Sequence, residues 1–370
     1  MVYDVVIFVH ALNSPCLHKY IHLNKHFNKN NLKSCLILDS SSKWGADTAS
    51  INNCIENDKD CGKDVYNFKT MSESLNFLNS LSYKISLIPS NFYKANTSIG
   101  NRHVAITNQK NATPIQISDH GVDFYICDSV NNFQLSTKYY EKTVFYDRVL
   151  KKRNSTIGYS GCLNWDKVEN CLPVYYTKNE FCKKYNLNPA RPIVAWAPSS
   201  VARTVLDGAS EAYKEVTKLN NVILKHHPSE YKRHKAHKIG GKWTHEVYST
   251  KPTAVLEPED THWWYKYSDV MLTYNSTISN ETLMYDLPIV YLDANKEENC
   301  LFSKDIPNEF RNQYIFAGKT CDVKNLKNFI INEDYKVNES IFEETKKIIF
   351  EGLESYYFYD NITKKVKDLL

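Results

Sequence analysis

The stretch from Tyr267 to Asp293 constrains the fold more than any other part of the sequence. It holds an apolar run, Asp269–Thr273, a turn rich in hydroxyl groups, Asn275–Thr277, a segment with helical character, Ser279–Tyr285, and a second apolar run, Leu287–Leu292. A strand, a helix and a strand in that order form a βαβ unit, and its crossover makes the two strands parallel. We therefore expect this part of the chain to lie in a parallel α/β sheet.

The turn between these two strands has the residues of an anion site. Small hydroxyl residues at the start of a helix leave its first N–H groups accessible, so Ser276 and Thr277 can bind a phosphate through backbone and hydroxyl donors. Glu281 lies one helical turn further on the same face, where it can accept a hydrogen bond from a ribose hydroxyl. The same residues also serve as ordinary helix N-caps, so the turn alone does not establish a ligand.

The length and composition indicate a folded protein of two domains. The chain has 370 residues, more than one ordinary hydrophobic core accommodates. Hydrophobic residues make up 42% of it and charged residues 24%, which excludes an intrinsically disordered chain. The formal net charge of +4 does not indicate a nucleic-acid partner, which would need a concentrated basic face.

The amino-terminal segment predicts a first strand, Tyr3–Val9, and not a signal peptide. It has no basic leader, and Asp4 interrupts its apolar run. No apolar run in the sequence approaches the roughly 20 residues that a membrane-spanning helix needs. We expect a cytoplasmic protein that is either soluble or peripheral to a membrane.

The rest of the first half alternates predicted strands and helices. The apolar segments are short and separated by polar stretches, as in α/β proteins. One long polar connection, Ser40–Phe68, receives no element. The predicted elements are a helix at His18–Phe27, a strand at Ser34–Leu38, a helix at Met71–Leu81, strands at Ser82–Ile88, His103–Thr107 and Val144–Tyr146, and a last strand and turn at Ser155–Gly161.

A His-Gly pair in this half has the character of a catalytic site. The segment Gln116–Gly121 is a hydrophobic lead-in that ends at His120, and Gly121 permits a tight turn. Such a turn would leave His120 at the end of a strand, where ligands bind in α/β sheets. A histidine there can take a proton from a hydroxyl nucleophile near neutral pH, and Asp119 is its neighbour in the predicted catalytic pair. The alternative is a surface histidine in a turn.

The second half restarts the alternation of strands and helices. The polar stretch Asp166–Pro189 has the character of a linker between domains and holds one short helix, Lys178–Tyr185. The elements predicted beyond it are a strand at Pro192–Ala197, a helix at Ser210–Leu219, a strand at Asn221–Lys225, a helix at Pro258–Tyr267, the βαβ unit, and amphipathic helices at Ser340–Tyr357 and Asn361–Leu370.

Polar side chains follow the strands of this half where ligands bind in α/β proteins. Ser199 and Arg203 come after one predicted strand, and His227 comes after the next. Because the carboxyl ends of parallel strands share one edge of a sheet, we expect these residues to converge with Ser276 on one crevice. Arg203 can offset phosphate charge and His227 can donate to a phosphate oxygen. Their alternatives are a solvated arginine and a histidine held in a rigid turn before Pro228.

The histidines between residues 231 and 245 do not predict a metal site. They lie among lysines and an arginine, which repel a cation, and no carboxylate or cysteine accompanies them at a metal-ligand spacing. The simplest interpretation is a solvated loop, and the alternative is a basic patch that meets an anionic membrane or a phosphate-rich polymer.

Taken in order, the motifs resemble the bacterial CDP-glycerol glycerophosphotransferases, the poly(glycerol or ribitol phosphate) polymerases of teichoic-acid and capsule synthesis. Those enzymes look like glycosyltransferases of the GT-B type. The resemblance covers roughly the last two-thirds of the chain and rests on the order of short motifs. The motifs are His120-Gly121, Ile157-Gly158-Tyr159, Ala197-Pro198, Leu224–Pro228, Tyr267-Ser268-Asp269, Ser276-Thr277 and the closing segment Phe358–Leu370.

The resemblance implies a fold class and a domain organisation. The fold would be α/β, with two Rossmann-like domains of the GT-B type that face each other across a cleft. Residues 1–175 would form the acceptor-side domain and residues 190–345 the nucleotide-donor domain. The helices in residues 346–370 would pack back across the boundary.

The resemblance also implies roles for the candidate residues. His120 would be the general base on the acceptor hydroxyl, in a cleft whose closure assembles the site. His227, Ser276 and Thr277 would bind the donor phosphates, and Glu281 would stand where the family has an acidic residue. The nucleotide would then be a substrate, with no metal and no cofactor. Acceptors of this class are lipid-linked glycans, which implies peripheral contact with the inner face of the plasma membrane.

The sequence departs from the family pattern where the acceptor and the transferred group are defined. Val122–Phe124 stands in place of the usual Thr-Pro-Leu and lysine after the His-Gly pair. Ser160–Cys162 stands in place of an arginine, and Asn275 and Thr277 replace the usual residues of the phosphate turn. These changes leave the expected scaffold and nucleotide site intact.

We expect a metal-independent transferase that moves a polyol phosphate or a sugar from a nucleotide-activated, cytidine-type donor to a hydroxyl of a bacterial surface glycan such as a capsule, teichoic acid or lipopolysaccharide. Two other enzymes stay open, a UDP-sugar-dependent glycosyltransferase and a sugar-nucleotide 2-epimerase. The epimerase needs acid and base carboxylates in the cleft, and the sequence shows no clear set. A catalytically inactive nucleotide-binding scaffold is the alternative outside enzymes.

Overall fold

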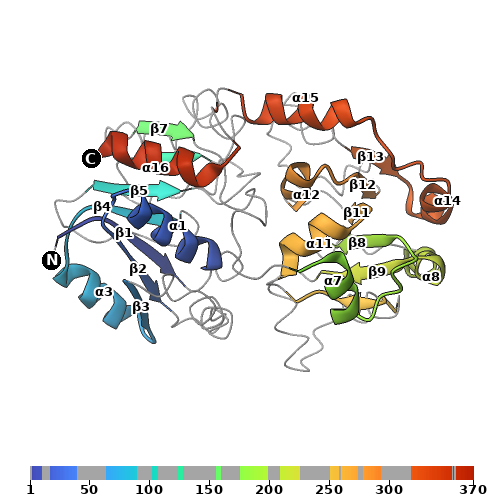
Figure 1. Ribbon diagram of the computed structural model, residues 1–370, viewed down its shortest axis with the longest axis horizontal. Helices are drawn as coiled ribbons and strands as arrows, with labels where there is room; N and C mark the ends of the chain where they lie inside the picture. Colours follow the sequence, from blue (N-terminus) through green and yellow to red (C-terminus); the bar gives the residue numbers. More distant parts are fainter. Residues whose placement is uncertain are drawn as a thin grey trace, which may run out of the picture. The chain divides into compact units, whose positions relative to one another are not determined.

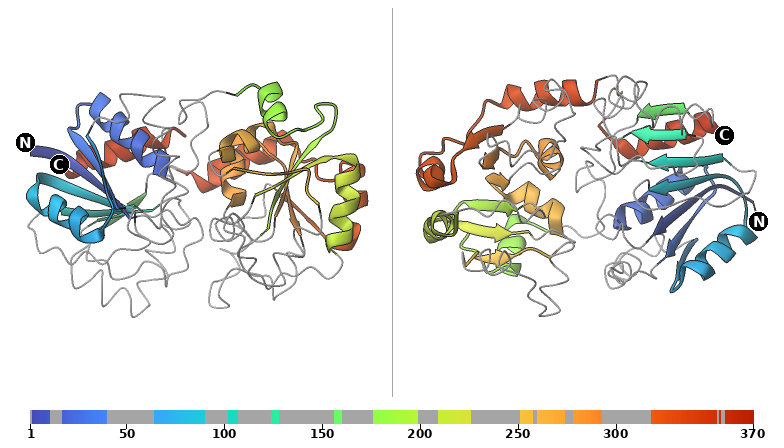
Figure 2. Two further views of the ribbon diagram at one scale, coloured as in Figure 1. Left: turned by 90° about the horizontal axis from the view of Figure 1, so that it is seen from below. Right: turned by 180° about the vertical axis from the view of Figure 1, so that it is seen from behind.

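Two separate parallel sheets organise the chain in the computed structural model (Figures 1 and 2). Unit 1 comprises Met1–Val174 together with Ile348–Leu370, and unit 2 comprises Tyr175–Lys347. The residues that the structure describes are 2–10, 17–39, 64–89, 102–106, 124–127, 156–159, 176–198, 209–225, 251–257, 260–273, 278–292, 318–351, 353 and 356–370.

The sheet of unit 1 has seven strands in the order β3-β2-β1-β4-β5-β6-β7. All neighbours are parallel, and central β1 pairs Val5 with Ser34 on one side and with Ile85 on the other. The chain builds outward from β1 to one edge and then from β4 to the other, as in doubly wound folds. The strands are β1 (Val2–His10), β2 (Ser34–Asp39), β3 (Val65–Phe68), β4 (Ser82–Pro89), β5 (Arg102–Ile106), β6 (Phe124–Cys127) and β7 (Thr156–Tyr159).

Helices cover both faces of this sheet (Figure 2). Alternate side chains of β1, for example Val5, pack in one cluster with α1 (Leu17–Lys29) and α16 (Phe358–Leu369). The intervening side chains, for example Val6, pack in another cluster with α3 (Met71–Ser80). Because both of its faces are buried, β1 is apolar almost throughout, which is the pattern of a central parallel strand.

The last helix of the chain completes the core of unit 1. The Tyr359 hydroxyl in α16 donates to the backbone oxygen of Lys19 in α1 at 3.2 Å. Nε2 of His26, also in α1, lies 3.0 Å from the Asp360 carboxylate. Ile362 is fully buried among residues of α1 and the sheet. The two ends of the sequence thus share one hydrophobic cluster.

The sheet of unit 2 repeats this plan with six parallel strands in the order β10-β9-β8-β11-β12-β13. The strands are β8 (Ile193–Ala197), β9 (Asn221–Leu224), β10 (Ala254–Val255), β11 (Val270–Thr273), β12 (Ile289–Leu292) and β13 (Gly318–Cys321). The helices are α7 (Lys178–Lys184), α8 (Ala209–Leu219), α11 (Thr261–Tyr267), α12 (Ile278–Thr282), α14 (Leu326–Ile331) and α15 (Glu339–Ile349), with 3-10 turns η9 (Leu283–Tyr285) and η12 (Val323–Asn325).

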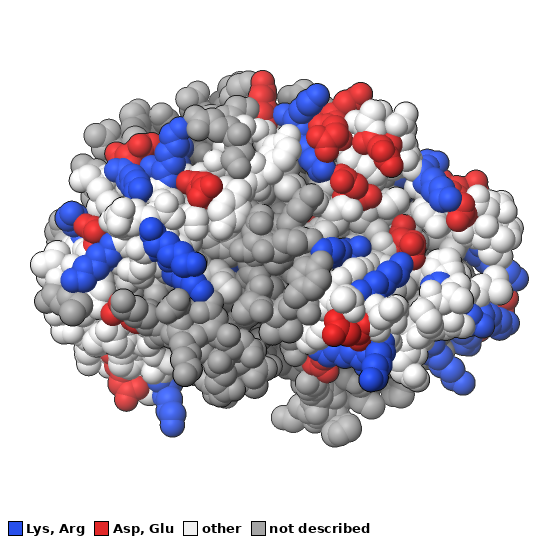
Figure 3. Space-filling view, in the orientation of Figure 1, with Lys and Arg blue, Asp and Glu red and all other residues white. Residues whose placement is uncertain are grey.

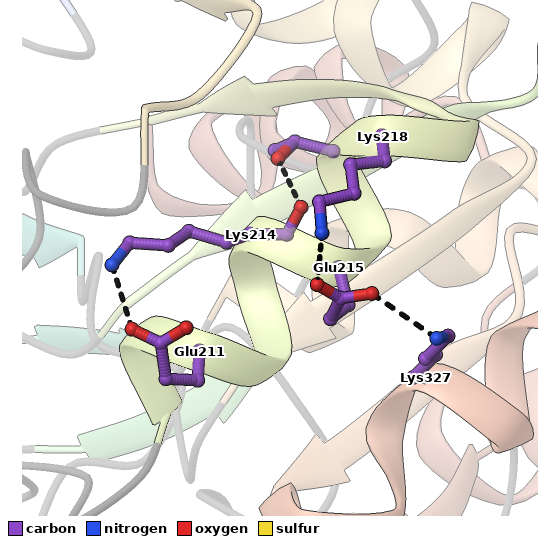
Figure 4. Close-up of polar contacts among 6 residues, drawn as sticks. Glu211, Lys214, Glu215, Lys218 and Lys327 are labelled. Carbon is purple, nitrogen blue, oxygen red and sulfur yellow. Dashed lines mark hydrogen bonds and ion pairs between the residues drawn. The ribbon is translucent and has the colours of Figure 1, made fainter.

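One face of this sheet is covered by α8 and α14. Trp196 of β8 stacks on Tyr213 of α8 with ring centroids 3.7 Å apart, and both are buried. Toward solvent, Glu215 of α8 pairs with Lys218 and, at 3.1 Å, with Lys327 of α14 (Figure 4). Solvated pairs of this kind contribute little stability, so the burial of apolar side chains beneath them holds the two helices on the sheet.

A buried lysine ties α15 to the turn that follows α12. Lys346, whose side chain is 5% exposed, donates to Asp286 at 2.6 Å and to Glu343 at 2.8 Å. Asp286 ends η9 in the left-handed conformation, with φ of 51°. Burial disfavours the charged lysine, but its hydrogen bonds to the two carboxylates outweigh burial, so the pKa of Lys346 is raised. The tie lies just before Ile348, where the chain returns to unit 1.

The structure confirms most of the expected elements within the residues it describes, with ends that differ by a few positions. It adds β3, β6, β10, β13 and α14, which were not expected. The helix expected at Ser340–Tyr357 is wrong in length because α15 ends at Ile349, near Gly352, a residue of low helix propensity. The helix expected from Asn361 begins earlier, at Phe358. The strand expected at Val144–Tyr146 lies outside the described residues.

The described surface carries mixed charge. On the face shown in Figure 3, lysine and arginine side chains are interspersed with aspartate and glutamate over the described residues. None of the helices formed by the described residues is both long enough and apolar enough to cross a membrane.

We predict that unit 1 loses stability as the pH falls from about 7.5 to about 5.5 because His26 resists protonation. Burial lowers the pKa of His26, Asp360 acts in the opposite direction, and Lys29 and Lys367 lower it further. The unfolded chain takes up the proton near the ordinary pKa of 6.5, so this contribution to stability is present above that pH and is lost below it. Denaturant unfolding at the two pH values measures the loss. It should be smaller in His26→Gln, and an equal loss in that variant would contradict the assignment.

Candidate functional site

The strand order of unit 2 reverses between β8 and β11, the two central strands. The chain leaves β8 for α8 on one face of the sheet and leaves β11 for α12 on the other (Figure 2). The two connections therefore diverge at the carboxyl ends of adjacent strands, which is where open α/β sheets bind their ligands. This edge of the sheet is the candidate site.

Side chains fix the pairing of β8 with β11 at both ends. At the amino end, the Asp269 carboxylate accepts from the backbone N–H of Ile193 at 2.7 Å, and the Asp269 N–H donates to the Ile193 oxygen at 2.8 Å. At the carboxyl end, Thr273 Oγ1 donates to the backbone oxygen of Ala197 at 2.9 Å, and Thr273 is fully buried. The base of the candidate site is therefore held in a single register.

Glu281 of α12 is the predicted site residue that falls within the described chain. Its Oε2 accepts a hydrogen bond of 2.7 Å from the hydroxyl of Tyr265 in α11. The helix predicted at Ser279–Tyr285 is confirmed in extent, but only Ile278–Thr282 is α-helical, and the 3-10 turn η9 continues it. Glu281 thus sits on a short helical segment and is held from a different helix.

Aromatic residues of α11 and η9 enclose Tyr265. Its ring lies 5.9 Å from that of His262 at an interplanar angle of 87°, and 5.7 Å from that of Tyr285. Nδ1 of His262 and the hydroxyl of Tyr285 form a hydrogen bond of 2.8 Å. His262 is buried within this cluster. It therefore packs in the core, which is the role expected for the helix at Pro258–Tyr267.

Sequence reasoning located this helix but did not pair Tyr265 with Glu281. His262 and Tyr265 are three positions apart, so they lie on the same face of the helix. This spacing was the one sign in the sequence that their side chains contact each other. No periodicity in the sequence relates either of them to Glu281, because that contact is made between two helices.

The other predicted site residues lie outside the described residues, so their placement stays a prediction. In the sequence, Ser199 and Arg203 come between β8 and α8, and His227 comes after β9. Ser276 and Thr277 come between β11 and α12. The predicted catalytic pair precedes β6, which begins at Phe124. These residues are Asp119, His120, Ser199, Arg203, His227, Ser276 and Thr277.

The described part of the site contains a carboxylate that already takes part in a hydrogen bond. Glu281 accepts from Tyr265, and a carboxylate has lone pairs for several hydrogen bonds. Across the described chain, no group of three or more histidine, cysteine, aspartate or glutamate side chains is placed to hold a metal ion.

The sequence matches no protein-family profile and no curated protein, whereas the fold matches solved structures along its whole length. MnaA of S. aureus with UDP has a TM-score of 0.58 at 11% identity, over 100% of this chain and 98% of that one. The wall teichoic acid polymerase TagF soaked with CDPG has a TM-score of 0.57 at 11% identity, over 99% and 88%. A Listeria monocytogenes protein assigned as a UDP-N-acetylglucosamine 2-epimerase has a TM-score of 0.59 at 11% identity, over 100% and 98%.

The chain therefore has the fold of these proteins, two Rossmann-like units of the GT-B type, as expected from the sequence. At 11% identity the likeness carries the fold alone.

We predict that Thr273→Val lowers the stability of unit 2 by about 1–2 kcal/mol, because the isosteric change leaves the Ala197 oxygen without its buried donor. Chemical denaturation followed by tryptophan fluorescence measures the change. Thr320→Val is the matched control: it removes the hydroxyl of an exposed threonine on edge strand β13 and should change stability by less than about 0.5 kcal/mol. Equal effects of the two variants would show that the Thr273 bond does not stabilise the pairing.

Proposed function

We propose that this protein is a metal-independent transferase that moves a polyol phosphate or a sugar from a nucleotide-activated donor, with cytidine favoured, to a hydroxyl of a bacterial surface glycan. Capsule, teichoic acid and lipopolysaccharide are the acceptor classes. The observation that carries the proposal is the switch point between β8 and β11, beside which Tyr265 holds the Glu281 carboxylate. This is the arrangement that a doubly wound domain uses to bind a nucleotide.

Unit 2 supplies the donor side in this proposal. The hydroxyl and backbone donors of Ser276 and Thr277 bind the phosphates, with Ser199, Arg203 and His227 from the neighbouring connections. Glu281 accepts from a ribose hydroxyl. Two proteins of the same fold support a nucleotide-activated donor, since MnaA was solved with UDP and TagF was soaked with CDPG.

The proposed reaction is a displacement on the transferred group. His120 takes the proton of the acceptor hydroxyl, with Asp119 beside it in the sequence. The acceptor oxygen bonds to the phosphorus or anomeric carbon of the transferred group, and the bond from that atom to the nucleotide phosphate oxygen breaks. The nucleotide leaves with the electron pair, and Arg203, His227 and the hydroxyl turn stabilise its charge in place of a metal. A lipid-linked acceptor would bring the protein to the inner membrane face.

A second candidate is chemistry on a UDP-sugar, either glycosyl transfer or 2-epimerisation. The observation that favours it is coverage: MnaA and the Listeria protein match over 98% of their own chains, against 88% for TagF. The epimerase would need carboxylates in acid and base roles. Near the switch point, the described carboxylate of Glu281 is engaged in a hydrogen bond from Tyr265.

We expect CMP or CDP to raise the melting temperature of the wild type, and Ser276→Ala/Thr277→Ala to abolish the shift. A ligand at one hundred times its dissociation constant stabilises the native state by about 2.7 kcal/mol, which a thermal-shift panel of CMP, CDP, UDP, UMP and GDP detects. Thr320→Ala is the control, because it removes an exposed hydroxyl from edge strand β13. A shift with uridine nucleotides alone favours the second candidate, and no shift with any nucleotide contradicts both.

We also expect His120→Ala to lower the rate of transfer by about a hundredfold or more, since the acceptor proton loses its base. Nucleotide binding, measured by calorimetry on the same variant, should be unchanged. If the variant transfers at the wild-type rate, His120 is a surface residue. If the wild type binds nucleotide but neither transfers nor epimerises, the protein is a scaffold.

A further inference from the structure

We propose that the outer surface of α1 and α16 is the face with which unit 1 docks on an anionic membrane, through lysines of both helices. The inference rests on the proposed function, because it names the surface that would bring the transferase to a lipid-linked acceptor. The candidate site belongs to unit 2, whereas both helices belong to unit 1, so the two surfaces can be tested separately.

The first step is that the two helices form one layer. α1 and α16 contact each other on one face of the sheet of unit 1 (Figure 2). Their inner side chains, for example Tyr20 and Ile362, are buried in the same hydrophobic cluster. The hydrogen bond from the Tyr359 hydroxyl to the Lys19 oxygen joins them further. Their outer side chains therefore belong to one continuous surface.

The second step is the excess of lysine on this surface. The whole chain is nearly balanced, with 46 lysines and arginines against 42 aspartates and glutamates. α1 nevertheless contains no acidic residue, and α16 contains only Asp360 and Asp368. Figure 3 shows lysine side chains gathered over these two helices. The lysines of the two helices that are not buried are Lys25, Lys29, Lys364, Lys365 and Lys367.

The third step is that cations of the two helices meet. Lys29 of α1 and Lys367 of α16 both lie close enough to His26 to lower its pKa. Asp360, one of the two acidic residues, is engaged by Nε2 of His26 at 3.0 Å. Within the described part of the chain, neither Lys29 nor Lys367 forms an ion pair with a carboxylate. Their charge is therefore available to an external anion.

The lysines on the outer helices of unit 2 differ in this respect. Lys214 of α8 pairs with Glu211 at 2.7 Å, and Glu215 pairs with both Lys218 and Lys327 (Figure 4). A carboxylate beside each of these lysines offsets its field. Exposed lysine alone therefore does not distinguish α1 and α16, but lysine without a carboxylate beside it does.

A bilayer is the partner that this surface fits. Both helices carry lysine and no arginine, and a lysine ammonium on its flexible stem binds an anionic headgroup without the fixed geometry of a guanidinium. Tyr357, half-buried against His26, and Leu370, 45% exposed, add the aromatic and apolar contacts typical of a membrane interface. Each lysine near an anionic leaflet strengthens binding by about fivefold.

The test is co-sedimentation of the full chain with vesicles that contain phosphatidylglycerol and with vesicles of phosphatidylcholine alone. The wild type should bind the anionic vesicles only, and less as the salt concentration rises, because salt screens the charges. Lys29→Gln/Lys364→Gln/Lys367→Gln should bind them about a hundredfold more weakly. Asp368→Asn, which removes an exposed carboxylate from α16, should bind them about fivefold more tightly.

Lys214→Gln/Lys218→Gln/Lys327→Gln is the matched control, because it lowers the net charge by the same amount on helices of unit 2. It should bind anionic vesicles within about twofold of the wild type. An equal loss in the two triple variants would show that overall charge binds the membrane and would overturn the inference. If the triple variant of α1 and α16 does not fold, the gain expected of Asp368→Asn decides the matter.

The nucleotide thermal shift, measured on the same proteins, separates this inference from the proposed function. A wild type that responds to nucleotides but does not bind anionic vesicles overturns the inference and leaves the proposed function standing. A wild type that binds these vesicles through α1 and α16 but responds to no nucleotide does the reverse. Binding to inorganic polyphosphate without binding to vesicles would assign the surface to a soluble polyanion and overturn the membrane as its partner.

Discussion

The pairing of β8 with β11 is the interaction on which the candidate site depends. The two strands belong to opposite halves of a doubly wound sheet, so their shared edge is the place where the chain leaves the sheet in two directions. Asp269 fixes one end of the pair and Thr273 the other, and both bonds go to the backbone of β8. A slip of one residue would turn every side chain of β11 to the wrong face and would move Thr273 away from Ala197.

The α/β class and the central strands could be predicted from the sequence because burial on both faces leaves a continuous apolar run. β8, Ile193–Ala197, is buried at all five positions, and the sequence predicted it as a strand at Pro192–Ala197. Three of the four edge strands, β3, β10 and β13, were not found in this way. β13 has two exposed positions of four, and β3, within the polar connection Ser40–Phe68, has none that is fully buried.

The candidate site was predictable where it depends on the order of strands and turns, and not where it depends on contacts between helices. Glu281 was placed from its spacing to the hydroxyl turn. Its partner Tyr265 belongs to another helix, and the link between them comes from the packing of α11 against the segment after β11. The sequence gives the residues of such a contact but not their pairing, because helical periodicity relates residues of one helix only.

The position of α16 has a consequence for synthesis of the protein. The hydroxyl of Tyr359 meets Lys19, 340 positions earlier in the chain, and Ile362 and Val366 lie in the same cluster as Val5. On the ribosome the amino-terminal strands emerge first, and α1 covers part of one face of their sheet, but the rest of that face stays uncovered until α16 has been made. Unit 2 is continuous in sequence and has all its parts earlier. Unit 2 can therefore complete its fold before unit 1 does. Until α16 is made, part of the apolar surface of unit 1 stays exposed, and nascent chains in that state need chaperones.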